Sequence, residues 1–86
     1  MEKFEIRIKR SAVKELVRLP NPDVRRILRR IRALQNDPRP AGAIKLAGRD
    51  TYRVRQGDYR ILYDVFDVVL VVEVIRIGRR GDVYRN

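Results

Sequence analysis

The sequence predicts an α+β fold with the element order β-α-α-β-β-β, in which a helical hairpin packs on one face of a four-stranded, mostly antiparallel sheet. Three patterns predict it: alternation of apolar and polar residues over 2–9, an apolar stripe at helical spacing over 24–34, and two alternating runs on either side of Gly57-Asp58. A length of 86 residues corresponds to one domain, so we expect residues 1–86 to share one hydrophobic core.

The first two elements are a strand and a short helix. Apolar residues occupy every second position between 2 and 9, which is typical of a half-buried strand. A helix should follow, with Ser11 as its N-cap and Pro20 as its end. The spacing assigns its apolar face to Val13, Leu16 and Val17.

A second, longer helix is expected to begin at Asn21 as its N-cap, with Pro22 in its first position and Asp23 near the positive end of its dipole. Residues 36–38, Asn-Asp-Pro, should end it. The stripe that marks its buried face consists of Val24, Ile27, Leu28, Ile31 and Leu34. Because only a short linker separates the two helices, they should form an antiparallel hairpin.

The second half of the chain is expected to form the rest of the sheet. Residues 39–50 contain Pro and Gly and should be a loop. The runs 51–56 and 59–66 flank Gly57-Asp58, which predicts a tight β-hairpin. Residues 68–77 are rich in Val and Ile on both faces, so this segment should be a central strand covered on both sides.

The two-residue turn fixes which side chains of the hairpin lie opposite each other. It pairs Arg55 with Arg60, and alternation places Arg53 on the same face. The opposite face, which should pack under the helices, carries Tyr52, Val54, Ile61 and Tyr63. Opposed like charges destabilise a sheet by about 0.2–1 kcal/mol, so we interpret the arginines as a platform for phosphate groups. The alternative is a solvated face that Asp64 or Glu73 partly neutralises.

The charge balance also favours a polyanionic partner. The chain has 21 Lys and Arg residues against 11 Asp and Glu, a formal net charge of +10, and 17 of the cations are arginine. Three further arginines should bind phosphates on the same platform: Arg76, Arg79 and Arg80. A second basic cluster lies on the outer side of the longer helix: Arg25, Arg26, Arg29, Arg30 and Arg32. It is either a docking surface for ribosomal or other RNA, or simply the solvated side of an amphipathic helix.

The composition excludes many kinds of site. With no His and no Cys, the chain has no disulfide framework, no zinc finger, no Ser-His-Asp triad and no imidazole acid or base. We expect no metal and no cofactor. The first residues are charged, unlike a signal peptide, and the longest apolar run, 68–72, is too short to span a membrane. These features predict a cytoplasmic protein without a membrane partner.

Two segments, Tyr52–Tyr63 and Ile77–Arg85, resemble the RelE toxins of toxin–antitoxin modules. The Lys45-Leu46-Ala47-Gly48 loop and the helical hairpin before it fit as well, so the resemblance covers essentially the whole chain. RelE toxins are endoribonucleases that cut mRNA in the ribosomal A site and are silenced by a cognate antitoxin. The resemblance therefore implies a RelE-like fold, a metal-independent nuclease that inhibits translation, mRNA on the ribosome as substrate, and a complex with an antitoxin.

The resemblance also implies roles for individual residues. Tyr84 would be the base that removes the 2′-hydroxyl proton, although an unperturbed phenol, with a pKa near ~10, needs nearby cations to ionise at neutral pH. Arg80 and Arg60 would supply those cations and hold the charge of the transition state. Arg53 and Arg55 would grip the phosphate and orient the substrate. The alternative for Tyr84 is an aromatic ring packed over the edge of the sheet.

Two other functions fit the same sequence. The related ParE toxins share the fold but inhibit DNA gyrase, and a non-catalytic module that binds RNA or an antitoxin would also be basic. The predicted convergence of the arginines with Tyr84 favours RNA cleavage, because a gyrase inhibitor would not need this set on one sheet face.

Overall fold

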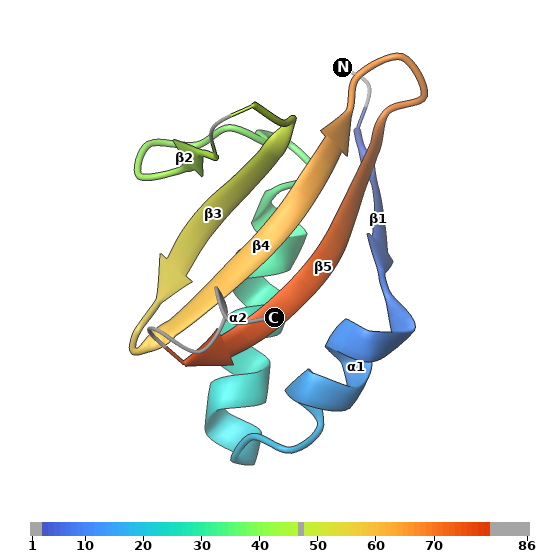
Figure 1. Ribbon diagram of the computed structural model, residues 1–86. Coiled ribbons are helices and arrows are strands. Elements are labelled where there is room, and N and C mark those ends of the chain that lie inside the picture. The colour runs from blue at the N-terminus through green and yellow to red at the C-terminus, as the bar shows by residue number, and fades with distance from the viewer. Residues whose placement is uncertain (1–2, 47, 80–86) are drawn as a thin grey trace.

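The computed structural model describes residues 3–46 and 48–79, and it has two layers, a five-stranded sheet with two helices on one face (Figure 1). The elements in chain order are β1 (Glu5–Ile8), α1 (Arg10–Leu16), α2 (Asn21–Ala33), β2 (Ile44–Lys45), β3 (Thr51–Gln56), β4 (Tyr59–Phe66) and β5 (Val71–Arg79). The strand order is β1-β5-β4-β3-β2, and only the β1–β5 pair is parallel among these neighbours. The predicted α+β class is confirmed, with one strand more than expected.

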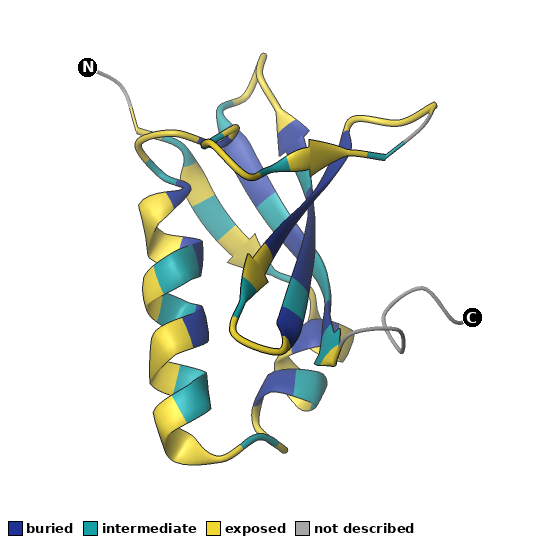
Figure 2. Cartoon of the chain, turned by 90° about the vertical axis from the view of Figure 1, so that its left-hand side faces the viewer, coloured by how far each residue is buried: buried dark blue, intermediate teal, exposed yellow. Residues whose placement is uncertain are grey.

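The core lies between α2 and the sheet, as the apolar stripe predicted. Ile27, Ile31 and Leu34 are buried, and Figure 2 shows the buried side of α2 turned toward the strands. The sheet contributes the other half of this core with Tyr52, Val54, Ile61, Tyr63, Val72, Val74 and Ile77. Since each buried aliphatic side chain contributes roughly 1.5–3 kcal/mol of transfer free energy, this interface is the main source of stability.

Both helices start earlier than predicted, α1 by two positions and α2 by one. α1 begins at Arg10 with Lys9 at its N-cap, so Ser11 lies inside the helix and caps nothing. Its buried face also differs from the predicted one, because Ala12 and Leu16 are buried while Val13 and Val17 are 40% and 69% exposed. In α2 the N-cap is Pro20 rather than Asn21; a proline carbonyl can still accept the first helical N–H, here from Val24 at 3.0 Å.

The sheet differs from the prediction at two places. The expected loop 39–50 contains the edge strand β2, which pairs with β3 through Ile44–Arg53 and Lys45–Tyr52. The last strand begins at Val71, because residues 67–70 form the turn after β4, where Val68 is 98% exposed. β5 lies between β1 and β4, so it is an interior strand as predicted. The expected cover on both of its faces was wrong, because both helices lie on one face of the sheet (Figure 1). No helix in the described part of the chain is long and apolar enough to cross a membrane.

Candidate functional site

The β3–β4 hairpin has the register that its turn predicts. Arg55 lies opposite Arg60, and Arg53 lies opposite Leu62. Gly57 supports the turn in the left-handed region at φ 59°, where glycine carries no steric penalty. Arg53, Arg55 and Arg60 therefore share the sheet face away from the helices, and we name this set the arginine face.

Arg53 is the most unusual member of the arginine face. Its side chain is buried, with only 6% of the residue exposed, and its Nε atom receives no hydrogen-bond partner within residues 3–46 and 48–79. Arg60 is half-buried beside it, whereas Arg55 is exposed at the end of the hairpin. A buried guanidinium without a carboxylate partner costs free energy, so this arrangement suits an anion that arrives from outside.

The acidic residues of this sheet face do not neutralise the positive charge of Arg53. Asp64 and Glu73 lie opposite one another on β4 and β5, and the hydroxyl of Thr51 donates a hydrogen bond to Asp64. Neither carboxylate forms an ion pair with Arg53 in the described residues. The alternative of a neutralised, merely solvated face therefore fits Arg53 poorly.

Arg76 reaches the arginine face only in part. Its backbone position lies opposite Leu62, but its Nε atom is 3.2 Å from a carboxylate oxygen of Glu15 in α1. The other oxygen of Glu15 accepts a hydrogen bond from the backbone N–H of Ile77 at 2.9 Å. Glu15 thus covers the stretch of β5 that extends beyond β1, and it holds Arg76 at the edge of the sheet.

The placement expected for Arg79 was wrong. Arg79 lies opposite Tyr59, whose side chain belongs to the helix-facing side, and its guanidinium sits 5.6 Å from the centre of that ring. The hydroxyl of Tyr59 donates a hydrogen bond to Asp23 at 2.9 Å, which raises the pKa of Tyr59. Arg79 is therefore separated from the arginine face by the sheet.

Two predicted catalytic residues, Arg80 and Tyr84, lie outside the described residues. Their convergence with Arg60 stays a prediction. A small cavity of about 70 Å³ lies at the described end of the hairpin, lined by Arg55, Gly57, Asp58, Tyr59 and Arg60. Two members of the arginine face, Arg55 and Arg60, thus open onto this cavity.

The outer side of α2 carries the five arginines that the sequence placed there. Arg30 is half-buried and the other four, Arg25, Arg26, Arg29 and Arg32, are exposed. Within the described chain only Arg26 of this cluster forms an ion pair, at 3.4 Å from Asp23. The cluster is thus an almost uncompensated cationic surface, as a polyanion-binding helix requires.

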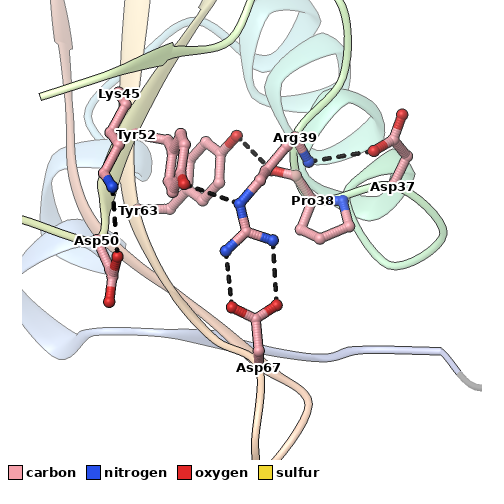
Figure 3. A network of polar contacts seen from close by, with 8 residues as sticks. All are labelled: Asp37, Pro38, Arg39, Lys45, Asp50, Tyr52, Tyr63 and Asp67. Carbon is pink, nitrogen blue, oxygen red and sulfur yellow. Dashed lines mark hydrogen bonds and ion pairs between the residues drawn. The ribbon is translucent and has the colours of Figure 1, made fainter.

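A polar network around Arg39 was not predicted from the sequence (Figure 3). Its Nη atoms donate to both carboxylate oxygens of Asp67, at 3.0 and 2.7 Å, and its Nε donates to the Tyr52 hydroxyl at 2.8 Å. These contacts raise the pKa of Arg39 and lower that of Asp67. Arg39 thereby fastens the segment after α2 to the turn between β4 and β5.

Two tyrosines complete this network. Tyr52 and Tyr63 stack with ring centres 5.9 Å apart, and the buried Tyr63 hydroxyl donates to the carbonyl of Pro38 at 2.7 Å. Burial raises the pKa of Tyr63 to about 12. A buried phenol with its own acceptor is a structural group, because its oxygen has no access to a substrate.

Two comparisons with known proteins both match toxins. Residues 6–84 match the family described as the ParE toxin of type II toxin–antitoxin system, parDE. A curated protein of Methanocaldococcus jannaschii that carries the toxin name RelE1 is 31% identical over 88 residues, with 98% of each chain covered.

Solved structures extend the comparison to the fold. The archaeal RelE–RelB complex from Pyrococcus horikoshii is 30% identical, with a TM-score of 0.79 over 92% of this chain and 97% of that chain. The isolated E. coli RelE toxin is 28% identical, with a TM-score of 0.79 over 94% of this chain and 90% of that chain. The likeness therefore extends over both layers of the molecule.

Proposed function

Because the chain belongs to the RelE/ParE family of type II toxin–antitoxin toxins, we propose that it is a ribosome-dependent endoribonuclease that cleaves mRNA and inhibits translation. The observation that carries this proposal is the arginine face, with a buried and unsatisfied Arg53 beside the opposed pair Arg55 and Arg60. A protein selected for stability alone gains nothing from this arrangement, whereas a phosphate would supply the missing acceptor oxygens.

The proposed reaction is cleavage of the RNA backbone by its own 2′-hydroxyl. The 2′-oxygen attacks the adjacent phosphorus, and negative charge builds up on the phosphoryl oxygens. The bond to the 5′-oxygen of the next nucleotide breaks, and this oxygen takes a proton from water, which leaves a 2′,3′-cyclic phosphate and a 5′-hydroxyl. Arg53 and Arg55 hold the phosphate in place. Arg60 and Arg80 stabilise the added charge, and Tyr84 removes the proton from the 2′-oxygen as its phenolate.

The arginine cluster on α2 is proposed to dock on ribosomal RNA. Its members are Arg25, Arg26, Arg29, Arg30 and Arg32, and a groove of about 230 Å³ beside them is lined in part by Gln56 of β3. A helix surface of this kind can contact several phosphates at once without reading a sequence. Docking through α2 would leave the arginine face on the other layer free for mRNA.

An antitoxin is the proposed protein partner, since the Pyrococcus horikoshii relative is solved as a RelE–RelB complex. We expect its acidic or amphipathic segment to cover the arginine face. Added antitoxin should then block RNA binding, measured by fluorescence anisotropy. Simultaneous binding of RNA and antitoxin at full affinity would contradict this covering.

Primer extension on mRNA after induction of the toxin tests the proposed activity. Cuts should be confined to reading frames that ribosomes occupy, and the same mRNA without its start codon should stay intact. Tyr84→Phe should restore translation, because a phenylalanine cannot accept the proton. Equal toxicity of this variant would remove Tyr84 from the mechanism.

A second candidate function is inhibition of DNA gyrase, favoured by the match to the ParE family description. Gyrase inhibition predicts the opposite fate of the mRNA in the same induced cells. Intact mRNA together with arrested DNA replication would support gyrase inhibition and contradict RNA cleavage.

A further inference from the structure

A second cavity lies on the helix side of the β3–β4 turn. It has a volume of about 290 Å³, and its lining includes Asp23 and Arg26 of α2, Gln56 and Tyr59 of the hairpin strands, Asp58 of the turn, and Arg79 of β5. Three elements that are distant in sequence therefore meet at one opening. The position of Arg79 on this side, rather than on the arginine face, completes the lining.

The charge of this cavity differs from that of every other basic surface described above. Two guanidinium groups, of Arg26 and Arg79, are matched by two carboxylates, of Asp23 and Asp58. A balanced cavity attracts a phosphate only weakly, because the Coulomb terms of the four groups oppose one another. Its donors and acceptors suit instead a neutral ligand with both kinds of group on its edge.

Planar groups form one wall of the cavity. The guanidinium of Arg79 lies over the Tyr59 ring at 5.6 Å, and the Tyr59 hydroxyl is fixed by its hydrogen bond to Asp23. Because Tyr59 is only 5% exposed, the outer plane of Arg79 is the surface on which a flat ligand can stack. Unstacked nucleobases in RNA are bound in this way, on aromatic rings or arginine planes, with hydrogen bonds to their edges.

We propose that this cavity binds one unstacked guanine base of the RNA. Guanine offers two adjacent donors, N1–H and N2–H, to the partly exposed carboxylate of Asp23. Its two oxygens already accept from Arg26 and from Tyr59, and each keeps a second lone pair for the base. Guanine also offers two acceptors, O6 and N7, to the guanidinium of Arg26, while Arg79 serves as the stacking surface. Adenine, cytosine and uracil do not offer both this pair of donors and this pair of acceptors, so the lining selects guanine.

The position of the cavity connects it to the proposed cleavage site. Gly57, Asp58 and Tyr59 line both this cavity and the smaller one that contains Arg55 and Arg60. One RNA strand can therefore pass around the turn, with a phosphate on the arginine face and a neighbouring base on the helix side. The inference rests on the proposed function in one respect, that the bound polymer is RNA.

Binding of 2′-O-methyl hexanucleotides to the full chain tests the proposal without cleavage. Each probe contains one variable base in a uridine background, and anisotropy gives its affinity. The guanine probe should bind about tenfold more tightly than the adenine probe, the advantage typical of one bidentate base contact. The hypoxanthine probe, which lacks the N2 amino group, should fall between them. Equal affinity for all three, or no binding of any of them, overturns the proposal.

Matched variants separate base recognition from general charge. Arg26→Ala and its neighbour Arg25→Ala remove one positive charge each from α2, but only Arg26 lines the cavity. Both should weaken binding to a similar extent, while only Arg26→Ala reduces the guanine-to-adenine ratio. Asp23→Asn should bring guanine and hypoxanthine to equal affinity. A ratio that neither Arg26→Ala nor Asp23→Asn changes overturns the cavity assignment, and cleavage of translated mRNA would still support the proposed function.

Discussion

Two arginines beside neighbouring residues of β3 are held in opposite ways. Arg39, at the β4–β5 end of the sheet, contacts the carboxylate of Asp67 and both the hydroxyl and the ring of Tyr52, so its guanidinium is satisfied within the described chain. Arg53 follows Tyr52 on the opposite face of β3, where it is more deeply buried and its Nε has no such partner. Burial alone therefore does not identify a structural arginine; the acceptors around it decide.

The largest change in cleavage rate is expected when the guanidinium of Arg53 is removed. Arg53→Met should lower the rate of mRNA cleavage by about 100-fold, since a cationic donor to the scissile phosphate is lost. The free energy of unfolding should stay unchanged or rise, because an uncompensated buried charge is replaced by an apolar chain. Chemical denaturation and a cleavage assay on the same samples measure both. A loss of stability that parallels the loss of activity would make Arg53 a structural residue.

For Tyr63, which belongs to the network around Arg39, we expect a loss of stability without a loss of cleavage. Tyr63→Phe should lower the free energy of unfolding by about 1–2 kcal/mol, because the buried carbonyl of Pro38 loses its donor. RNA cleavage at a temperature where the variant is folded should stay within about twofold of the wild type. A stability equal to that of the wild type would show that this hydrogen bond contributes nothing.

Tyr63 also predicts a pH dependence. Its pKa is raised to about 12 in the folded chain from an ordinary value near ~10, so the folded state holds the proton more tightly. The stabilisation by the neutral phenol is complete below pH ~10 and is lost as the pH rises toward about 12. Denaturation curves at stepped alkaline pH should show this decline, and Tyr63→Phe should remove its share of the decline.

A smaller effect is expected at Arg39. Arg39→Ala should lower the free energy of unfolding by about 1 kcal/mol, mainly through the hydrogen bond to Tyr52 and the packing on its ring. The contact with Asp67 is exposed and screened by water and salt, so Asp67→Ala should cost less than Arg39→Ala. RNA affinity should not change in either variant. A large loss of RNA affinity in Arg39→Ala would place this end of the sheet in the binding site.

The smallest effect is expected on α2. Arg29→Ala should leave stability within about 0.5 kcal/mol, because the side chain is exposed and makes no ion pair with a described residue. The dependence of log affinity on log salt should become shallower by about one unit if Arg29 contacts one phosphate. An unchanged salt dependence would assign this side of the helix to the solvent.

The sequence predicted most of the fold because local rules set it. The turn at Gly57-Asp58 determined the register of Arg55 with Arg60, and helical spacing found the buried residues of α2. β2 was missed because both of its residues are exposed and two residues show no period. The start of α1 was displaced by two positions and that of α2 by one, because neither helix is capped by a side-chain hydrogen bond of the kind that Ser11 and Asn21 suggested.

The candidate site was predicted less completely for two physical reasons. Arg76 and Arg79 are three positions apart, so strand alternation places them on opposite faces of the sheet. Which face each one takes depends on the irregularity in pairing between Leu62 and Tyr63, and nothing in the sequence marks that irregularity. The Arg39–Asp67 pair joins residues far apart in the chain, so spacing carries no information about it. Non-local contacts of this kind depend on the finished topology.

Glu15 has a consequence for how the molecule behaves at high concentration. Its carboxylate occupies the backbone N–H of Ile77, the point where β5 would otherwise offer a free template for another chain. Cross-β fibril growth from this edge of β5 is therefore obstructed by one side chain rather than by an additional strand. A glutamine there would keep the size of the side chain while weakening the protection against self-association.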